Sequence, residues 1–171
     1  MSIALTDAVY HRELIDGREI QKPLPKNLHA FIQTYLLQWF GRELPKQYRV
    51  ASELNVICGS DRLVPDVILT TRNAHYVDGD LVDPPLLAVE IMSPGQTLSD
   101  LLNKCERMLA TGTPICWVIW PERREAWTYT RDEALREATR ILSVALPNSA
   151  SGSEVEYLRI PLAEMWAELS E

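Results

Sequence analysis

The 171-residue chain lacks an excess of positive charge, a paired set of cysteines and any long apolar run. It carries 17 Lys and Arg against 24 Asp and Glu, so its net charge of −7 excludes binding to nucleic acid through overall charge. Any contact with a phosphate backbone needs a local basic patch. Cys58, Cys105 and Cys116 are too far apart for a C-x-x-C zinc site, which favours buried free thiols in a reducing compartment.

Long hydrophobic segments are also missing. The longest apolar run, residues 115–120, covers about six residues, far fewer than a membrane-spanning helix needs. Residues 1–14 contain no apolar core of the kind that signal peptides have. We therefore expect a cytoplasmic protein that does not contact membranes. The 46% hydrophobic and 24% charged residues are typical of a globular chain, and its length indicates a single domain over residues 1–171.

Periodicity predicts the secondary structure. Apolar residues at helical spacing predict helices over 27–40 and from 98 to about 109, and Pro161 suits the first turn of a closing helix. Apolar or alternating runs predict strands at 48–57, 64–70, 86–92, 115–120, 125–130, 139–145 and 155–160. Residues 71–85 and 146–153 are expected to form loops. This interleaving of helices and strands predicts one α/β domain.

Two carboxylates fall inside strands that should be buried. Glu90 lies in the apolar segment 86–92, and Asp66 follows Pro65 at the start of a β-branched run. A carboxylate in such a place loses hydration worth several kcal/mol unless a cation or hydrogen bonds replace the water. A divalent cation between the two would also relieve their mutual repulsion. The alternatives are a simple turn at Pro65-Asp66 and an exposed edge strand around Glu90.

Lys104 is the cation best placed to reach these carboxylates. On a helical wheel it lies roughly 100° from the centre of the apolar face of the second helix, at the border between core and solvent. A lysine at such a border can extend across the end of a sheet. A helical lysine is, however, more often a solvated surface residue.

These residues occur in an ordered set of short motifs. The set consists of Pro65-Asp66-Val67, Val89-Glu90-Ile91-Met92-Ser93-Pro94, Asp100, Lys104, Gly112, Pro114 and Trp117. It resembles the PD-(D/E)XK superfamily of restriction endonuclease-like proteins over residues 29–121. The superfamily normally has a lysine two residues after the second acid, where this chain has Met92. One large bacterial branch shows the same departure and carries the lysine on the helix, at the position of Lys104.

The resemblance implies a restriction endonuclease-like fold, with a central mixed β-sheet flanked by helices. It also implies a divalent-metal-dependent endonuclease that hydrolyses DNA. Asp66, Glu90 and the main-chain carbonyl of Ile91 would bind Mg²⁺ or Mn²⁺, and Lys104 would orient the attacking water. Glu53, in the strand before Pro65-Asp66, would hold a second metal or a metal-bound water. Homodimers are common in this fold, and apolar residues near Trp127 or Trp166 would serve such an interface.

Other functions stay open. The missing lysine at Met92 and the acidic net charge are compatible with a catalytically silent member of the fold that binds nucleic acid or assembles with partners. A hydrolase for small phosphoesters is a third alternative. The cations at Arg42, Lys46, Arg49, Arg62 and Arg72 could form a basic rim for DNA or simply a solvated surface. His75 and Tyr76 could stack on a base or pack on the protein.

Overall fold

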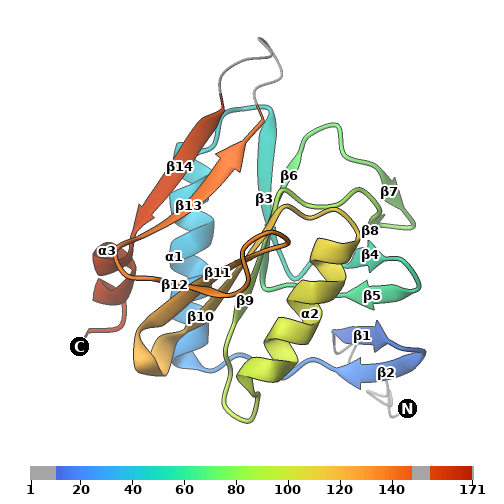
Figure 1. The fold of residues 1–171 in the computed structure, drawn as a ribbon, viewed down its shortest axis with the longest axis horizontal. Helices are drawn as coiled ribbons and strands as arrows, with labels where there is room; N and C mark the ends of the chain where they lie inside the picture. The colour runs from blue at the N-terminus through green and yellow to red at the C-terminus, as the bar shows by residue number, and fades with distance from the viewer. Residues whose placement is uncertain (1–10, 148–154, 171) are drawn as a thin grey trace, which may run out of the picture.

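A central sheet of six strands organises the chain (Figure 1). The computed structural model describes residues 11–147 and 155–170. The strand order is β12-β11-β10-β9-β6-β3, with β9 and β10 parallel and the other neighbours antiparallel. The strands are β3 (Tyr48–Ser52), β6 (Val67–Thr71), β9 (Leu87–Ile91), β10 (Ile115–Trp120), β11 (Glu125–Thr130) and β12 (Arg136–Ala138).

Helices α1 (Asn27–Glu43) and α2 (Leu98–Ala110) cover opposite faces of this sheet (Figure 1). Because side chains alternate along a strand, Val89 and Ile91 of β9 pack in the core on the α1 side. Ala88 lies in the second core, beneath α2. Because helices cover both faces of the sheet, the central strands bury side chains on both sides and form continuous apolar runs in the sequence. These runs allowed the strands to be predicted.

A second sheet, of order β2-β1-β5-β4-β8-β7, packs beside α2 (Figure 1). Its strands are β1 (Arg12–Ile15), β2 (Arg18–Gln21), β4 (Val56–Cys58), β5 (Asp61–Leu63), β7 (Tyr76–Val77) and β8 (Asp80–Leu81). Arg107 of α2 contacts Asp16, in the β1–β2 turn, at 2.8 Å and Asp61 of β5 at 2.6 Å. These ion pairs fix the N-terminal hairpin against α2.

The C-terminal part completes the core on the α1 side. It consists of the short helix η1 (Pro121–Arg123), the antiparallel hairpin β13 (Ile141–Leu146) and β14 (Glu156–Pro161), and α3 (Leu162–Ala167). Leu142 and Ile160 of the hairpin and Met165 of α3 are fully buried with the α1 residues. Trp166 packs against the same core, whereas Trp127 packs against the core beneath α2.

The predicted fold class is confirmed, but the second sheet was not predicted, since β1, β2 and β5 lie outside the expected strands. The strand expected at 48–57 is split into β3 and β4, and the loop expected at 71–85 contains the short hairpin β7–β8. That hairpin turns at Asp78-Gly79, where both residues have positive φ. Most of the loop expected at 146–153 lies outside the described residues. Within the described ranges no helix has both the length and the hydropathy to span a membrane.

Candidate active site

Asp66 and Glu90 meet on neighbouring strands. Asp66 immediately precedes β6, Glu90 lies in β9, and these strands pair antiparallel with Val67 opposite Val89. Both side chains are about 1% exposed. The Ile91 amide donates a hydrogen bond to Asp66 Oδ2 at 2.6 Å, so the Asp66 carboxylate is held against the Glu90 strand. Ile91 contacts Asp66 through its backbone N–H, whereas the sequence prediction concerned its main-chain carbonyl as a metal ligand.

Lys104 reaches Glu90 from α2. Its Nζ lies 2.8 Å from Glu90 Oε2 and 2.7 Å from Glu13 Oε1. Glu13 belongs to β1 and also accepts a hydrogen bond from the Val64 amide at 2.8 Å. Lys104 is only 5% exposed because the N-terminal hairpin covers it. The side chain is therefore more deeply buried than the predicted position at the border between core and solvent. Lys104, Glu90 and Glu13 are called the Lys104 cluster below.

A second buried lysine stands at Asp66. Lys22, directly after β2, places its Nζ 2.6 Å from Asp66 Oδ1 and 2.8 Å from Glu53 Oε2. Gln33 of α1 donates to Glu53 Oε1 and to the Asp66 carbonyl, both at 2.9 Å. Glu53 has a left-handed backbone (φ 53°), which is uncommon outside glycine and recurs at functional sites. Lys22, Asp66 and Glu53 are called the Lys22 cluster below.

His29 of α1 completes this side of the site. Its Nε2 lies 3.3 Å from Asp66 Oδ1, and its Nδ1 is 2.9 Å from the hydroxyl of Ser93. Such a partner on the second ring nitrogen fixes the orientation of the imidazole, an arrangement that also supports metal-bound histidines. His29 is buried, and contacts of both ring nitrogens, with Asp66 and with Ser93, fix the orientation of the ring.

Burial, His29 and the two lysines determine the protonation states of the buried groups. Burial disfavours ionisation of Asp66, but His29 and the Lys22 ammonium outweigh it and hold the pKa of this carboxyl well below its usual range. Burial raises the pKa of Glu90, although Lys104 opposes the shift. Burial also disfavours the charged forms of both lysines, yet the surrounding carboxylates raise the pKa of Lys22 and of Lys104. Both ammonium groups therefore stay charged at neutral pH.

The donor set at Asp66 fits a divalent ion. His29, Glu53 and Asp66 each offer one ligand atom, and these atoms lie within 4.8 Å of one another. Carboxylate oxygens suit Mg²⁺ and Mn²⁺, and an added imidazole favours the transition metal. Glu90 Oε1 is buried and has no hydrogen-bond partner among the described residues, so it too has a free lone pair.

Four residues of the site were not predicted from the sequence: Glu13, Lys22, His29 and Gln33. One signal pointed to the first two, since Asp16-Gly17 is a typical hairpin turn, and both residues have positive φ here. Recognition of that turn would have placed β1 and β2 in a hairpin. His29 and Gln33 are one helical turn apart on α1, but a polar pair at that spacing has no distinctive pattern.

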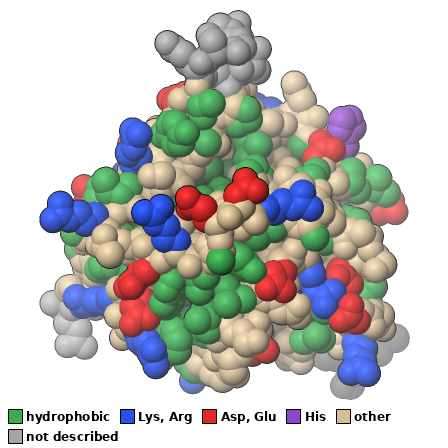
Figure 2. All heavy atoms as spheres, in the orientation of Figure 1, with side chains coloured by type: hydrophobic (Ala, Val, Ile, Leu, Met, Phe, Trp, Pro, Cys, Tyr) green, Lys and Arg blue, Asp and Glu red, His purple; other side chains and the backbone are tan. Residues whose placement is uncertain are grey.

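The cations that could have formed a basic rim do not lie together at this site. Arg49 and Arg72 stand at the end of β3 and β6 opposite to Glu53 and Asp66, where with Lys46 they line a cavity of about 390 Å³. Arg62 lies 4.0 Å from Asp80, and His75 is hydrogen-bonded to Asp83. Basic and acidic side chains are interspersed over the face that Figure 2 shows.

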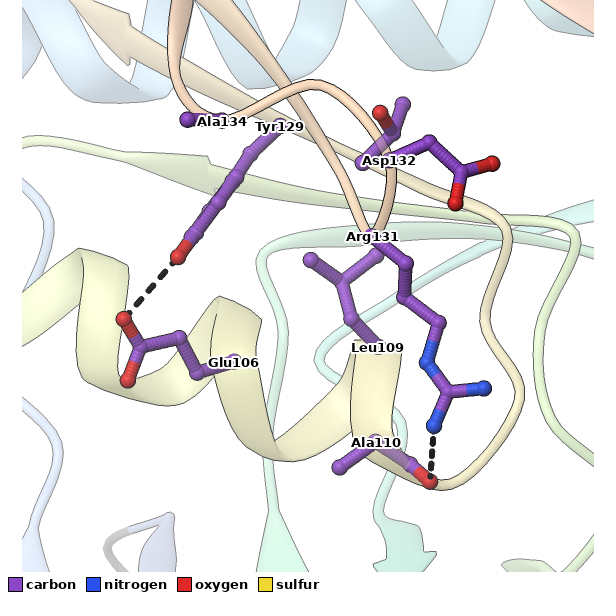
Figure 3. Close-up of a pocket in the computed structure, with 8 residues that line it drawn as sticks. Glu106, Leu109, Ala110, Tyr129, Arg131, Asp132 and Ala134 are labelled. Carbon is purple, nitrogen blue, oxygen red and sulfur yellow. Dashed lines mark hydrogen bonds between the residues drawn. The ribbon is translucent and has the colours of Figure 1, made fainter.

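A cavity of about 420 Å³ between α2 and β11 is separate from these clusters (Figure 3). Its lining includes Glu106, which accepts a hydrogen bond from Tyr129 at 2.9 Å, and Arg131, which donates to the Ala110 carbonyl at 3.2 Å. These polar groups are already paired with each other or with the backbone. The cavity therefore carries no chemistry comparable to that of the buried lysines and carboxylates.

Comparisons with known proteins concern the family and the fold of the chain. The profile of the Uma2 family, described as "Putative restriction endonuclease", matches residues 4–161. A crystal structure of a "putative nuclease belonging to DUF820" from Anabaena variabilis ATCC 29413 superposes with a TM-score of 0.74 at 23% identity. The superposition covers 93% of this chain and 91% of that one, so the two share a fold. No protein of curated function matches the chain.

Proposed function

The chain belongs to the Uma2 family of restriction endonuclease-like proteins, and we propose that it is a divalent-metal-dependent endonuclease that hydrolyses DNA. The observation that supports this most is the convergence of Asp66, Glu90 and Lys104 from three different elements. Buried carboxylates beside a buried ammonium are costly to a fold, and such arrangements are concentrated at functional sites.

Asp66, Glu53 and His29 would hold the ion, Mg²⁺ or Mn²⁺, with Glu90 and the main-chain carbonyl of Ile91 as further ligands. When bound, the ion would polarise the scissile phosphate and lower the pKa of a coordinated water. The Ile91 amide fixes Asp66 Oδ2 and so orients the opposite oxygen toward the ion. Ser93 fixes the His29 ring in the same way.

Lys104 would stabilise the charge that develops on the phosphate. As water attacks phosphorus and the bond to the leaving oxygen breaks, negative charge grows on the non-bridging oxygens. A fixed ammonium in a buried site stabilises this charge without reorganising. Glu13 is a positioning residue in this scheme, because it is a second carboxylate that holds Lys104 Nζ, at 2.7 Å, beside Glu90 at 2.8 Å. Met92, at the place of the superfamily's usual lysine, is nearly buried on the same side of the sheet.

Single-turnover cleavage of a supercoiled plasmid in the presence of Mn²⁺ tests the proposal. We expect the wild type to cleave and Asp66→Ala and Glu90→Gln to be inactive, with all three proteins folded. A wild type that is folded, binds Mn²⁺ and leaves the plasmid intact would contradict the proposal.

A second candidate function is a catalytically silent binding or assembly module. The observation in its favour is that Lys22 and Lys104 each form ion pairs with two carboxylates, so that Asp66, Glu53, Glu90 and Glu13 all have a cationic partner from the chain itself. Calorimetric titration with Mn²⁺ separates the two candidates. A module of this kind has no reason to bind the ion, whereas the nuclease must bind it.

A further inference from the structure

The ammonium group of Lys22 lies where the candidate metal set would bind its ion. Its Nζ is within 2.8 Å of carboxylate oxygens from both Asp66 and Glu53, the two acids that also belong to the candidate metal set. The residue is 8% exposed and comes from the segment that joins the N-terminal hairpin to α1. Lys22 is thus a cation of the chain itself, bound between the carboxylates that would bind the ion.

An ammonium group and a divalent ion cannot share this place. A metal would sit about 2.1 Å from its carboxylate oxygens, which leaves no room for Nζ between the same atoms. Two cations held that close would also repel strongly in a buried site. Binding of the ion therefore requires the Lys22 side chain to leave Asp66.

The structure provides space for that movement. A cavity of about 250 Å³ is lined by Lys22, Gln33 and Glu53, together with Pro23, Leu24 and Pro25. Lys22 is hydrogen-bonded to His11 through its backbone N–H, so rotation of the side chain alone leaves the hairpin register intact. The flexible four-carbon stem of a lysine suits such a displacement. Lys104 differs, since it is held by Glu90 Oε2 and Glu13 Oε1, whereas Glu90 would reach the ion through its other oxygen, Oε1, so Lys104 need not move.

We infer that Lys22 is a displaceable counterion that competes with the divalent ion for Asp66 and Glu53 and so sets the metal affinity of the site. This inference rests on the proposed metal-dependent function. Without the ion, Lys22 keeps the buried carboxylates paired and the fold intact. With the ion bound, its ammonium group moves into the adjacent cavity.

Lysine labelling of the wild-type protein tests the displacement directly. Acetylation by an N-hydroxysuccinimide ester, read by mass spectrometry, is compared in EDTA and in saturating Mn²⁺. We expect the modification rate of Lys22 to rise several-fold with Mn²⁺. Lys104 is the buried control and should stay protected, whereas the exposed Lys26 and Lys46 should react equally in both conditions.

Calorimetric titration with Mn²⁺ tests the competition. Lys22→Met keeps most of the stem but removes the charge, and we expect it to bind Mn²⁺ on the order of 10-fold more tightly than the wild type, because no competing state remains. Lys26→Met is the matched control from the same segment and should bind like the wild type. Lys22→Gln serves as the second variant if circular dichroism shows that Lys22→Met does not fold.

The outcomes separate the inference from the proposed function. If the wild type binds Mn²⁺ while Lys22 stays protected and the Lys22 variants bind no more tightly, the inference is wrong and the metal site stands. If neither the wild type nor a folded Lys22 variant binds Mn²⁺ at millimolar concentration, both the inference and the proposed function are overturned.

Discussion

The Lys104 cluster and the Lys22 cluster each contain one lysine and two carboxylates but differ in their surroundings. In each, one buried lysine bridges two carboxylates at 2.6–2.8 Å. All three residues of the Lys104 cluster are buried, whereas in the Lys22 cluster Glu53 is only half-buried and lines a cavity with Lys22. Asp66 and Glu53 of the Lys22 cluster belong with His29 to the three-residue candidate metal set, whereas the Lys104 cluster offers only Glu90 Oε1 as a further ligand. We therefore expect Lys104 to stay paired with its carboxylates during the reaction and Lys22 to be displaced from its carboxylates by the divalent ion.

The largest effect is expected for Lys104→Ala. Loss of the ammonium group should slow single-turnover plasmid cleavage by about 10²-fold or more, from losing one electrostatic contact with the transition state. It should also destabilise the protein by about 3–5 kcal/mol, because Glu90 and Glu13 are left buried together. Adding Met92→Lys should recover part of the rate. Full activity of Lys104→Ala would show that Lys104 has only a structural role.

Lys22→Met should separate the two clusters by its dependence on metal. In EDTA the variant should lose about 3 kcal/mol of unfolding free energy, because Asp66 and Glu53 lose their cation. Saturating Mn²⁺ should restore most of that loss by binding to the folded state. Denaturant unfolding with and without Mn²⁺ measures both values. Lys104→Ala should show no comparable restoration, and equal restoration of both variants would remove the distinction between the clusters.

Glu13→Gln should have an intermediate effect. The variant keeps an acceptor for the Val64 amide but removes the charge beside Lys104, so we expect a loss of about 1–2 kcal/mol and slower cleavage at unchanged substrate affinity. Glu19→Gln on the neighbouring strand is the matched control, because its pair with Arg12 is exposed. Single-turnover rates over a series of DNA concentrations separate the two effects. Equal behaviour of both variants would show that Glu13 does not position Lys104.

The smallest effect is expected at Asp100. Its carboxylate accepts hydrogen bonds from the backbone and hydroxyl of Thr97, which cap α2 and lower the pKa of Asp100. Asp100→Ala should cost about 0.5–1 kcal/mol, with Asn103→Ala as the exposed control on the same helix. Because the folded pKa is lowered, this stabilisation is complete above the ordinary value of 3.8 and disappears as the pH falls below it. Urea unfolding at pH 7 and pH 3 measures the difference, and a constant difference would argue against the cap.

The sequence predicted the parts of the site that depend on buried strands. Asp66 and Glu90 were recognisable because a carboxylate in a buried apolar strand is costly. Lys104 was recognisable through the resemblance to the restriction endonuclease-like branch that carries its lysine on this helix, and the helical wheel only permitted that role. Its depth was not predictable, since the hairpin that covers it is distant in the sequence. That hairpin gave no periodic signal because every residue of β2 is exposed. The Asp16-Gly17 turn marks the hairpin, but the contacts of Glu13 with Lys104 and of Lys22 with Asp66 depend on tertiary packing that no local pattern encodes.

Diffraction from crystals soaked in Mn²⁺ tests most directly whether a divalent ion replaces Lys22 at Asp66. Anomalous scattering locates the manganese independently of the protein atoms. The account predicts one strong peak between Asp66 and Glu53, with Lys22 Nζ moved out of contact with both carboxylates and Lys104 still bound to Glu90. Lys22 in its place between Asp66 and Glu53, with no anomalous peak at saturating Mn²⁺, would contradict the account.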